Sequence, residues 1–184
     1  MQTTASTVGD MPTTGAARPG PVSIVDAAEA PAAEESAGAR PIAIRIPAIQ
    51  VDAEVERAFI VDGLMQPPTG PLVVAWYGQT ERVGVAGNAV FAGHVDYAGF
   101  GPAVFAQLGA LAEGDTVEVI AKTGIQVIFG VVWSRLYDAA SAPVEEILAQ
   151  GDQEEVTLIT CGGAFDAAVG LYSDRLIVRA RRVA

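Results

Sequence analysis

The sequence predicts an all-β domain, a closed or nearly closed barrel that carries two short helices. Short apolar runs rich in β-branched and aromatic residues recur along the chain, and Gly, Pro and Asp residues punctuate them. No long helical pattern alternates with the strands, which favours a barrel over a mixed α/β sheet. About half of the 184 residues (51%) are hydrophobic, enough for a substantial core.

Eight runs have the composition of strands, and we expect them at residues 41–46, 53–60, 71–75, 88–94, 115–121, 125–136, 155–161 and 175–181. Two stretches have helical signals. Residues 102–108 begin with a proline and pair Phe105 with Leu108 at helical spacing. Residues 143–150 also begin with a proline and carry Glu145 and Glu146 in the first turn.

The chain divides into a linker and a folded domain. Residues 1–39 are rich in Ala, Thr, Pro, Gly, Ser and Glu, a composition that buries too little apolar surface to offset the entropy of ordering. We expect a flexible linker there and a single domain over residues 40–184. No stretch reaches the roughly 20 apolar residues of a membrane span, and no signal peptide is visible.

The charge of the chain excludes two classes of partner. There are 22 Asp and Glu residues against 11 Lys and Arg, a net charge of −11. Nucleic acid needs a basic footprint, and anionic lipid attracts basic surfaces. We therefore expect neither nucleic-acid binding nor docking of the domain on an anionic membrane.

Three side chains that can carry out covalent acyl transfer lie at predicted strand ends. Cys161 is the only cysteine, His94 is the only histidine, and Arg175 opens the run fourteen positions after the cysteine. A thiol nucleophile, an imidazole acid or base, and a cation for an oxyanion fit that chemistry. Each also has a plain structural interpretation, because a lone thiol is usually a small buried hydrophobe and a strand arginine is usually solvated.

The neighbours of the thiol extend this hypothesis. Gly162 and Gly163 would leave the sulfur uncrowded and present backbone N–H groups to an oxyanion, although glycines after a strand are often plain turn residues. One His and one Cys do not supply the usual ligands of a zinc site. We expect no metal and no cofactor.

These motifs resemble the sortases, the cysteine transpeptidases of bacterial cell surfaces. The likeness rests on the string Thr157 to Cys161 with Arg175, on Ala92-Gly93-His94-Val95-Asp96, and on the Gly101-Pro102 run; it covers about residues 41–182. Trp76-Tyr77 and the run 161–166 are most similar to class F or class E sortases. The resemblance implies an eight-stranded barrel with the active site in a groove on its outer wall.

The resemblance also implies a reaction. Cys161 would cleave a Leu-Pro-x-Thr-Gly-like sorting signal between Thr and Gly, and an amine such as that of a peptidoglycan precursor would take the acyl group from the thioacyl enzyme. His94 would transfer protons, Arg175 would hold substrate and oxyanion, and Thr160 would be an auxiliary substrate contact or an ordinary strand residue. Sortases are extracytoplasmic and normally membrane-anchored, and no anchor is seen in this sequence.

Two alternatives stay open from the sequence. One is another Cys/His peptidase that acts by hydrolysis only. The other is a non-catalytic barrel that binds peptides in its groove. Residues 26–36 lack the Asp-Pro-aromatic lid motif of pilin-polymerising sortases, so pilus assembly is disfavoured.

Overall fold

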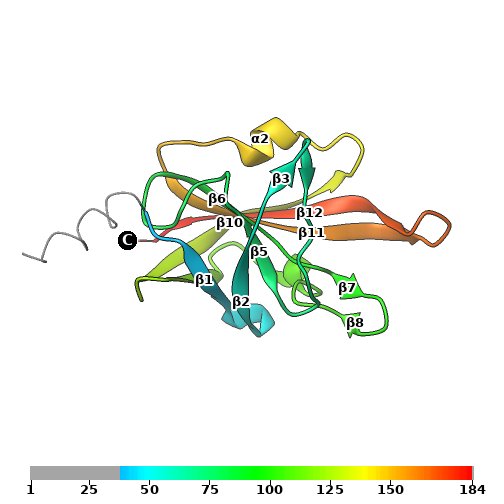
Figure 1. Cartoon of the computed structure of the whole chain (residues 1–184), viewed down its shortest axis with the longest axis horizontal. Helices are drawn as coiled ribbons and strands as arrows, with labels where there is room; N and C mark the ends of the chain where they lie inside the picture. Colours follow the sequence, from blue (N-terminus) through cyan, green and yellow to red (C-terminus); the bar gives the residue numbers. More distant parts are fainter. Residues whose placement is uncertain (1–37, 184) are drawn as a thin grey trace, which may run out of the picture.

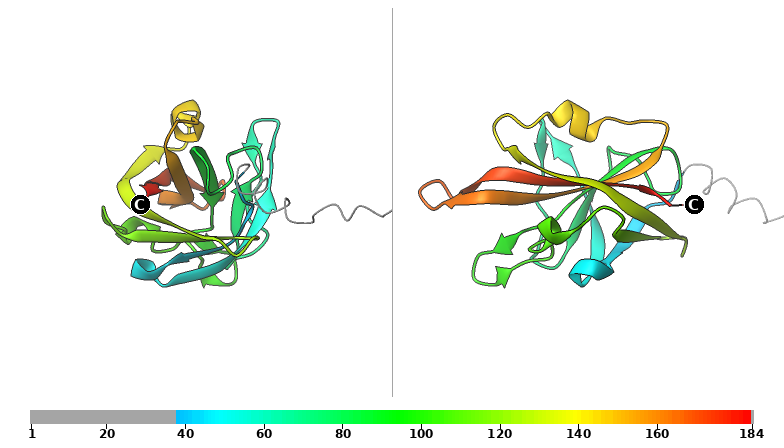
Figure 2. Two further views of the ribbon diagram at one scale, coloured as in Figure 1. Left: turned by 90° about the vertical axis from the view of Figure 1, so that its left-hand side faces the viewer. Right: turned by 180° about the vertical axis from the view of Figure 1, so that it is seen from behind.

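The computed structural model describes residues 38–183, which form a closed barrel (Figures 1 and 2). Its strands follow one another around the wall in the order β1-β2-β5-β6-β11-β12-β10-β9, and β9 pairs with β1 to close it. In chain order they are β1 (Pro41–Ile46), β2 (Val51–Ala58), β5 (Val74–Tyr77), β6 (Gly87–Ala92), β9 (Thr116–Ala121), β10 (Gln126–Asp138), β11 (Glu154–Asp166) and β12 (Leu171–Arg182). The predicted all-β barrel of eight strands is confirmed.

Two of the strand pairs in the wall are parallel, and one of them positions the site. β6 runs parallel to β11, and β2 runs parallel to β5. β11 is antiparallel to β12 on its other side. The carboxyl end of β6 and the second half of β11 therefore meet on the same part of the wall, with β12 alongside.

Side-chain alternation separates the barrel core from its outer face. On β11, Val156 and Leu158 are fully buried in the core cluster, and on β10 Val127 and Phe129 are buried in the same cluster. Because successive side chains of a strand point to opposite faces, the odd-numbered residues of β11 lie on the outer wall. Cys161 is one of them.

The β11–β12 hairpin is longer than the sequence predicts. The expected strands 155–161 and 175–181 run on to Asp166 and begin at Leu171, so the hairpin projects from the barrel (Figure 2). The prediction that Cys161 and Arg175 lie at strand ends is wrong. Gly162 continues the ladder opposite Asp174, and the register shifts only beyond it, before Phe165.

One predicted helix is absent from its place. Residues 102–108 contain the end of β8 (Gly101–Pro102), a turn, and the start of a 3-10 helix at Leu108–Ala110. Bonds to other segments hold this turn, since the Phe105 N–H donates to the His94 carbonyl (2.9 Å) and the Val104 N–H donates to that of Pro71 (2.8 Å). The second predicted helix is present as α2 (Val144–Leu148).

Small elements complete the fold. A 3-10 helix spans Pro47–Ile49, and two short hairpins pair β3 (Ile60–Val61) with β4 (Leu64–Met65) and β7 (Asp96–Tyr97) with β8. Residues 1–37 lie outside the described part, so the predicted linker stays a prediction; Ala39 forms an isolated bridge with Val83. Within residues 38–183, no helix is long and apolar enough to cross a membrane.

Candidate active site

Cys161 lies in the second half of β11 with its thiol free and partly exposed. Its neighbours on either side in the chain differ in burial: Thr160 is buried, and Gly162 is partly exposed. The thiol therefore sits on the outer wall of the barrel rather than in the core. A partly exposed thiol is open to a substrate, which a buried structural cysteine is not.

The parallel ladder between β6 and β11 places His94 close to the level of Cys161. Ala92 pairs with Ile159, and the Gly93 N–H continues the ladder by donating to the Ile159 carbonyl (3.0 Å). The Thr160 hydroxyl donates to the Gly93 carbonyl (2.8 Å) and fixes the same stretch from inside. Counting two positions beyond the last pair brings His94 level with Cys161.

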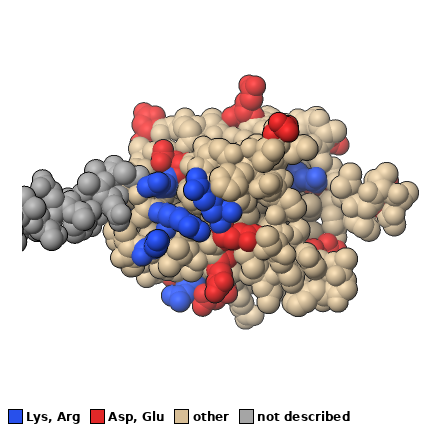
Figure 3. All heavy atoms as spheres, viewed as in Figure 1, with Lys and Arg blue, Asp and Glu red and all other residues tan. Residues whose placement is uncertain are grey.

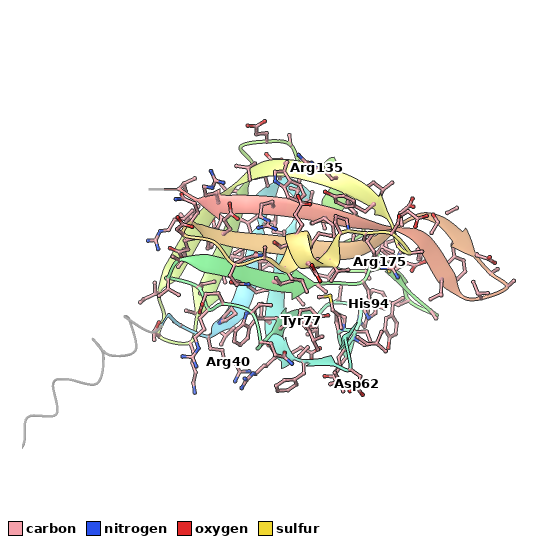
Figure 4. All side chains as sticks on the ribbon, turned by 90° about the horizontal axis from the view of Figure 1, so that it is seen from above. Arg40, Asp62, Tyr77, His94, Arg135 and Arg175 are labelled. Carbon is pink, nitrogen blue, oxygen red and sulfur yellow. The ribbon has the colours of Figure 1, made fainter. Side chains whose placement is uncertain are left out.

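Arg175 flanks the thiol from the other side. It is the direct partner of Cys161 in the antiparallel ladder of β11 and β12. Side chains at directly opposed positions lie on one face with Cβ atoms about 5 Å apart. Figure 4 shows His94 and Arg175 together, toward the end of the barrel away from Arg40. The fold thus brings together the three predicted catalytic residues, with Cys161 in the middle.

The Arg175 guanidinium is oriented by its own hairpin. Its Nη1 donates to the backbone carbonyls of Asp174 (2.8 Å) and Tyr172 (3.2 Å). Within residues 38–183 these are its only hydrogen bonds, and the side chain is partly exposed. One edge of the guanidinium is therefore fixed, while the remaining N–H groups are free to bind an oxygen of a substrate.

The His94 ring is held by a loop carbonyl and an aromatic edge. Its Nε2 lies 3.1 Å from the carbonyl oxygen of Pro68. The Tyr97 ring packs against it in a T-shaped arrangement with centroids 5.3 Å apart. A carbonyl oxygen only accepts, so Nε2 carries the hydrogen in this bond.

A hydrogen bond between β7 and β12 beside the site was not predicted from the sequence. The Tyr172 hydroxyl of β12 donates to Oδ2 of Asp96 in β7 (2.7 Å). This bond, together with slight burial and electrostatic interactions with Asp96 and Cys161, raises the pKa of Tyr172. It ties the loop after His94 to the hairpin that carries Arg175. The Asp96 position in the His94 motif was the only signal for it.

The two predicted substrate contacts have different surroundings. Thr160 is 3% exposed, and its hydroxyl donates a hydrogen bond to the Gly93 carbonyl. Gly162 is partly exposed, and a Cβ there would come within 2.9 Å of Leu136 Cδ1. Gly163 has a φ of +74°, and a Cβ would collide with the Asp174 carboxylate. Both glycines therefore serve the close passage of β11 along its neighbours.

The segment with α2 packs on the outer face of the barrel, where Arg179 of β12 and Glu155 of β11 lie beneath it. Arg179 of β12 donates to the Ile147 carbonyl (2.8 Å) and to Oε2 of Glu155 (2.8 Å). Burial favours a raised pKa for Glu155, but the hydrogen bonds and charges of Arg181 and Arg179 outweigh it and lower that pKa. A pocket of about 220 Å³ adjoins them, lined by Trp133, Tyr137, Glu146, Ile147, Glu155 and Arg179.

Charge is unevenly spread over the molecule. Figure 3 shows basic side chains gathered toward the end of the barrel where the chain enters, while the projecting β11–β12 hairpin shows no charged side chain on this face. Arg40, Arg82 and Lys122 line one pocket at that end. Among residues 38–183, no three His, Cys, Asp or Glu side chains are grouped so as to hold a metal ion.

Comparison with known proteins identifies the family. A model described as Sortase domain matches residues 44–183. With the closed barrel and its outer-wall thiol, this match defines the chain as a cysteine transpeptidase. The chain belongs to the sortase family. No curated protein sequence matches it.

Solved sortase structures share the barrel. A lid mutant of sortase A from Corynebacterium diphtheriae is 23% identical, with a TM-score of 0.60, and the match covers 79% of this chain and 72% of that one. Sortase C-1 from Actinomyces oris is 22% identical (TM-score 0.59; 77% and 73% covered). A Clostridium perfringens sortase D5 transpeptidase is also 22% identical (TM-score 0.58; 78% and 79% covered). At this identity the likeness shows the fold.

Proposed function

We propose that this sortase cleaves a Leu-Pro-x-Thr-Gly-like sorting signal between Thr and Gly. It transfers the acyl group that ends at Thr to an amine of the cell wall, such as that of a peptidoglycan precursor. The observation that supports the proposal is the strand register, in which Cys161 is the direct partner of Arg175, while Cys161 and His94 each lie two positions beyond the last pair of β11 and β6. The reaction would take place at the extracytoplasmic surface of a bacterial cell.

Each group has one role in the proposed reaction. The Cys161 thiolate attacks the Thr carbonyl carbon, and the free N–H groups of Arg175 donate to the oxyanion. The C–N bond then breaks, and the glycine nitrogen leaves with a proton from His94. An incoming amine attacks the thioester and gives a proton to His94, and the C–S bond breaks to restore the thiolate. Substrate contacts at Thr160 and Gly162 stay predictions.

One experiment separates this function from its alternatives. The protein is incubated with a fluorogenic Leu-Pro-x-Thr-Gly peptide and triglycine, and the products are identified by mass spectrometry. We expect a peptide joined to triglycine through its Thr. Cleaved peptide without any amine adduct would instead indicate a hydrolase. Intact peptide would indicate a binding module.

A further inference from the structure

One peptide group connects a carboxylate on the barrel to the imidazole of His94. The Thr69 N–H donates to Oε1 of Glu56 (2.7 Å), and the Pro68 carbonyl oxygen lies 3.1 Å from His94 Nε2. The nitrogen of Thr69 and the carbonyl of Pro68 belong to the same amide. The carboxylate, the amide and the imidazole therefore form one continuous chain of hydrogen bonds.

The carboxylate end of this chain is firmly held. Oε2 of Glu56 accepts a second hydrogen bond from the Thr69 hydroxyl (2.7 Å), so both carboxylate oxygens are hydrogen-bonded to the same residue. Glu56 lies on β2, where it is paired with Ala75 of β5. The charge of the carboxylate also affects Tyr77 of β5. Burial is the main cause and the charge of Glu56 the second cause that together raise the pKa of Tyr77 to about 12.

The segment with Pro68 is fixed at its other end too. The Tyr77 hydroxyl donates to the Gln66 carbonyl (2.7 Å), and the Gln66 N–H donates to the Phe59 carbonyl (3.0 Å). Pro68 itself is buried. The carbonyl that meets His94 is thus a rigid acceptor rather than a chance contact of a loose loop.

A charged acceptor on one side of an amide strengthens the acceptor on its other side. Hydrogen bonds to a carboxylate are stronger than neutral ones, and bonds in a chain polarise one another. The polarised Pro68 carbonyl favours a hydrogen on Nε2, which leaves Nδ1 as the nitrogen able to accept a proton in the neutral ring.

We propose that Glu56 is a positioning residue for His94 and acts through the Pro68–Thr69 peptide group. It holds the ring orientation and selects the Nε2–H tautomer, so that Nδ1 exchanges protons with the substrate amine. The inference rests on the proposed role of His94 as proton-transfer group. It assigns Glu56, through one peptide group, the function that an aspartate in direct contact with the histidine has in serine hydrolases.

The test uses the fact that His94 is the only histidine, so the imidazole nitrogen spectrum contains one ring. Two-bond ¹H–¹⁵N spectra of the neutral ring are recorded for the wild type, Glu56→Gln and Glu54→Gln. Glu54 is the matched control, an exposed acid on the same strand. We expect an unprotonated Nδ1 in the wild type and the control, and a shift toward Nδ1–H in Glu56→Gln. We also expect kcat/KM to fall about 10-fold with little change in KM.

Two further results decide the proposal. Thr69→Val keeps the backbone N–H but loses the hydroxyl bond, and we expect a smaller shift in the same direction. An Nδ1–H tautomer in the wild type, or a ring spectrum unchanged in both Glu56→Gln and Glu56→Ala, would overturn it. The spectra are recorded without turnover, so they test the tautomer independently of the sorting-signal reaction. The expected tautomers combined with no reaction on the sorting signal would contradict the proposed function and leave the role of Glu56 standing.

Discussion

At the scale of single residues, the candidate site is a thiol on β11 with Arg175 opposite it on β12 and with His94 just beyond the end of β6. Two backbone carbonyls of its own hairpin accept hydrogen bonds from Arg175 Nη1, and its other N–H groups have no partner within residues 38–183. Asp96 and Tyr172 close the arrangement by tying the loop after His94 to β12.

We predict that Arg175→Ala lowers kcat about 100-fold or more, since removal of an oxyanion donor costs roughly 10²–10³ in rate. The thermal midpoint changes little because the side chain is partly exposed. Transpeptidation rates and circular dichroism melting measure the two effects. Arg135→Ala is the matched control, an exposed arginine on β10. Turnover close to wild type in Arg175→Ala would remove the role given to this guanidinium.

The sequence was sufficient to predict that Cys161, His94 and Arg175 lie near one another, because Cys161 and His94 are the only residues of their kind and Arg175 opens the apolar run fourteen positions after the cysteine. It was not sufficient for Glu56, whose link to His94 runs through a backbone amide that no residue type marks. The Tyr172 bond was missed for a related reason, since it joins positions 76 residues apart.

At the scale of elements, the strands were predictable and the connections were not. Apolar runs bounded by Gly, Pro and Asp residues predicted strands such as β1 and β9 to within a few residues. Each strand of the two short hairpins is only two residues long, which is too short for an alternating pattern to identify it. Residues 102–108 have helical spacing, but bonds from Phe105 and Val104 to other loops hold them in a turn.

The segment with α2 depends on a partly buried ion pair beneath it. We predict that Glu155→Gln lowers the free energy of unfolding at pH 7 by about 1–3 kcal/mol, because two arginines lose a charged acceptor. The lowered pKa of Glu155 means that its contribution is present at neutral pH and is lost as the pH falls below the ordinary value of 4.5. The difference between wild type and variant should therefore shrink in acid.

Urea unfolding at a series of pH values measures the difference in unfolding free energy between the wild type and Glu155→Gln. Glu154→Gln is the control, because Glu154 pairs with one arginine, Arg182, whose side chain is 46% exposed against 9% for Arg179, and its loss should cost less. A difference between wild type and Glu155→Gln that stays constant down to strongly acidic pH would contradict the role of the carboxylate charge.

At the scale of the whole molecule, closure of the barrel joins distant strands into one core. Phe129 of β10 is 0% exposed in the main core cluster, while its neighbour Ile128 is 39% exposed. We predict that Phe129→Ala costs about 3–5 kcal/mol of unfolding free energy and Ile128→Ala less than about 1 kcal/mol. Guanidinium unfolding followed by fluorescence measures both. Equal losses at the two positions would contradict the assignment of inner and outer faces.

The central claim is that the thiol of Cys161 takes up the acyl part of a sorting signal. Intact-mass spectrometry tests it most directly, with the protein mixed with a Leu-Pro-x-Thr-Gly peptide in the absence of an added amine and quenched in acid. We predict a mass increase equal to the peptide acyl group ending at Thr, located on the fragment with Cys161, removed by hydroxylamine, and absent in Cys161→Ala. Peptide cleavage by Cys161→Ala, or an adduct on another residue, would contradict the account.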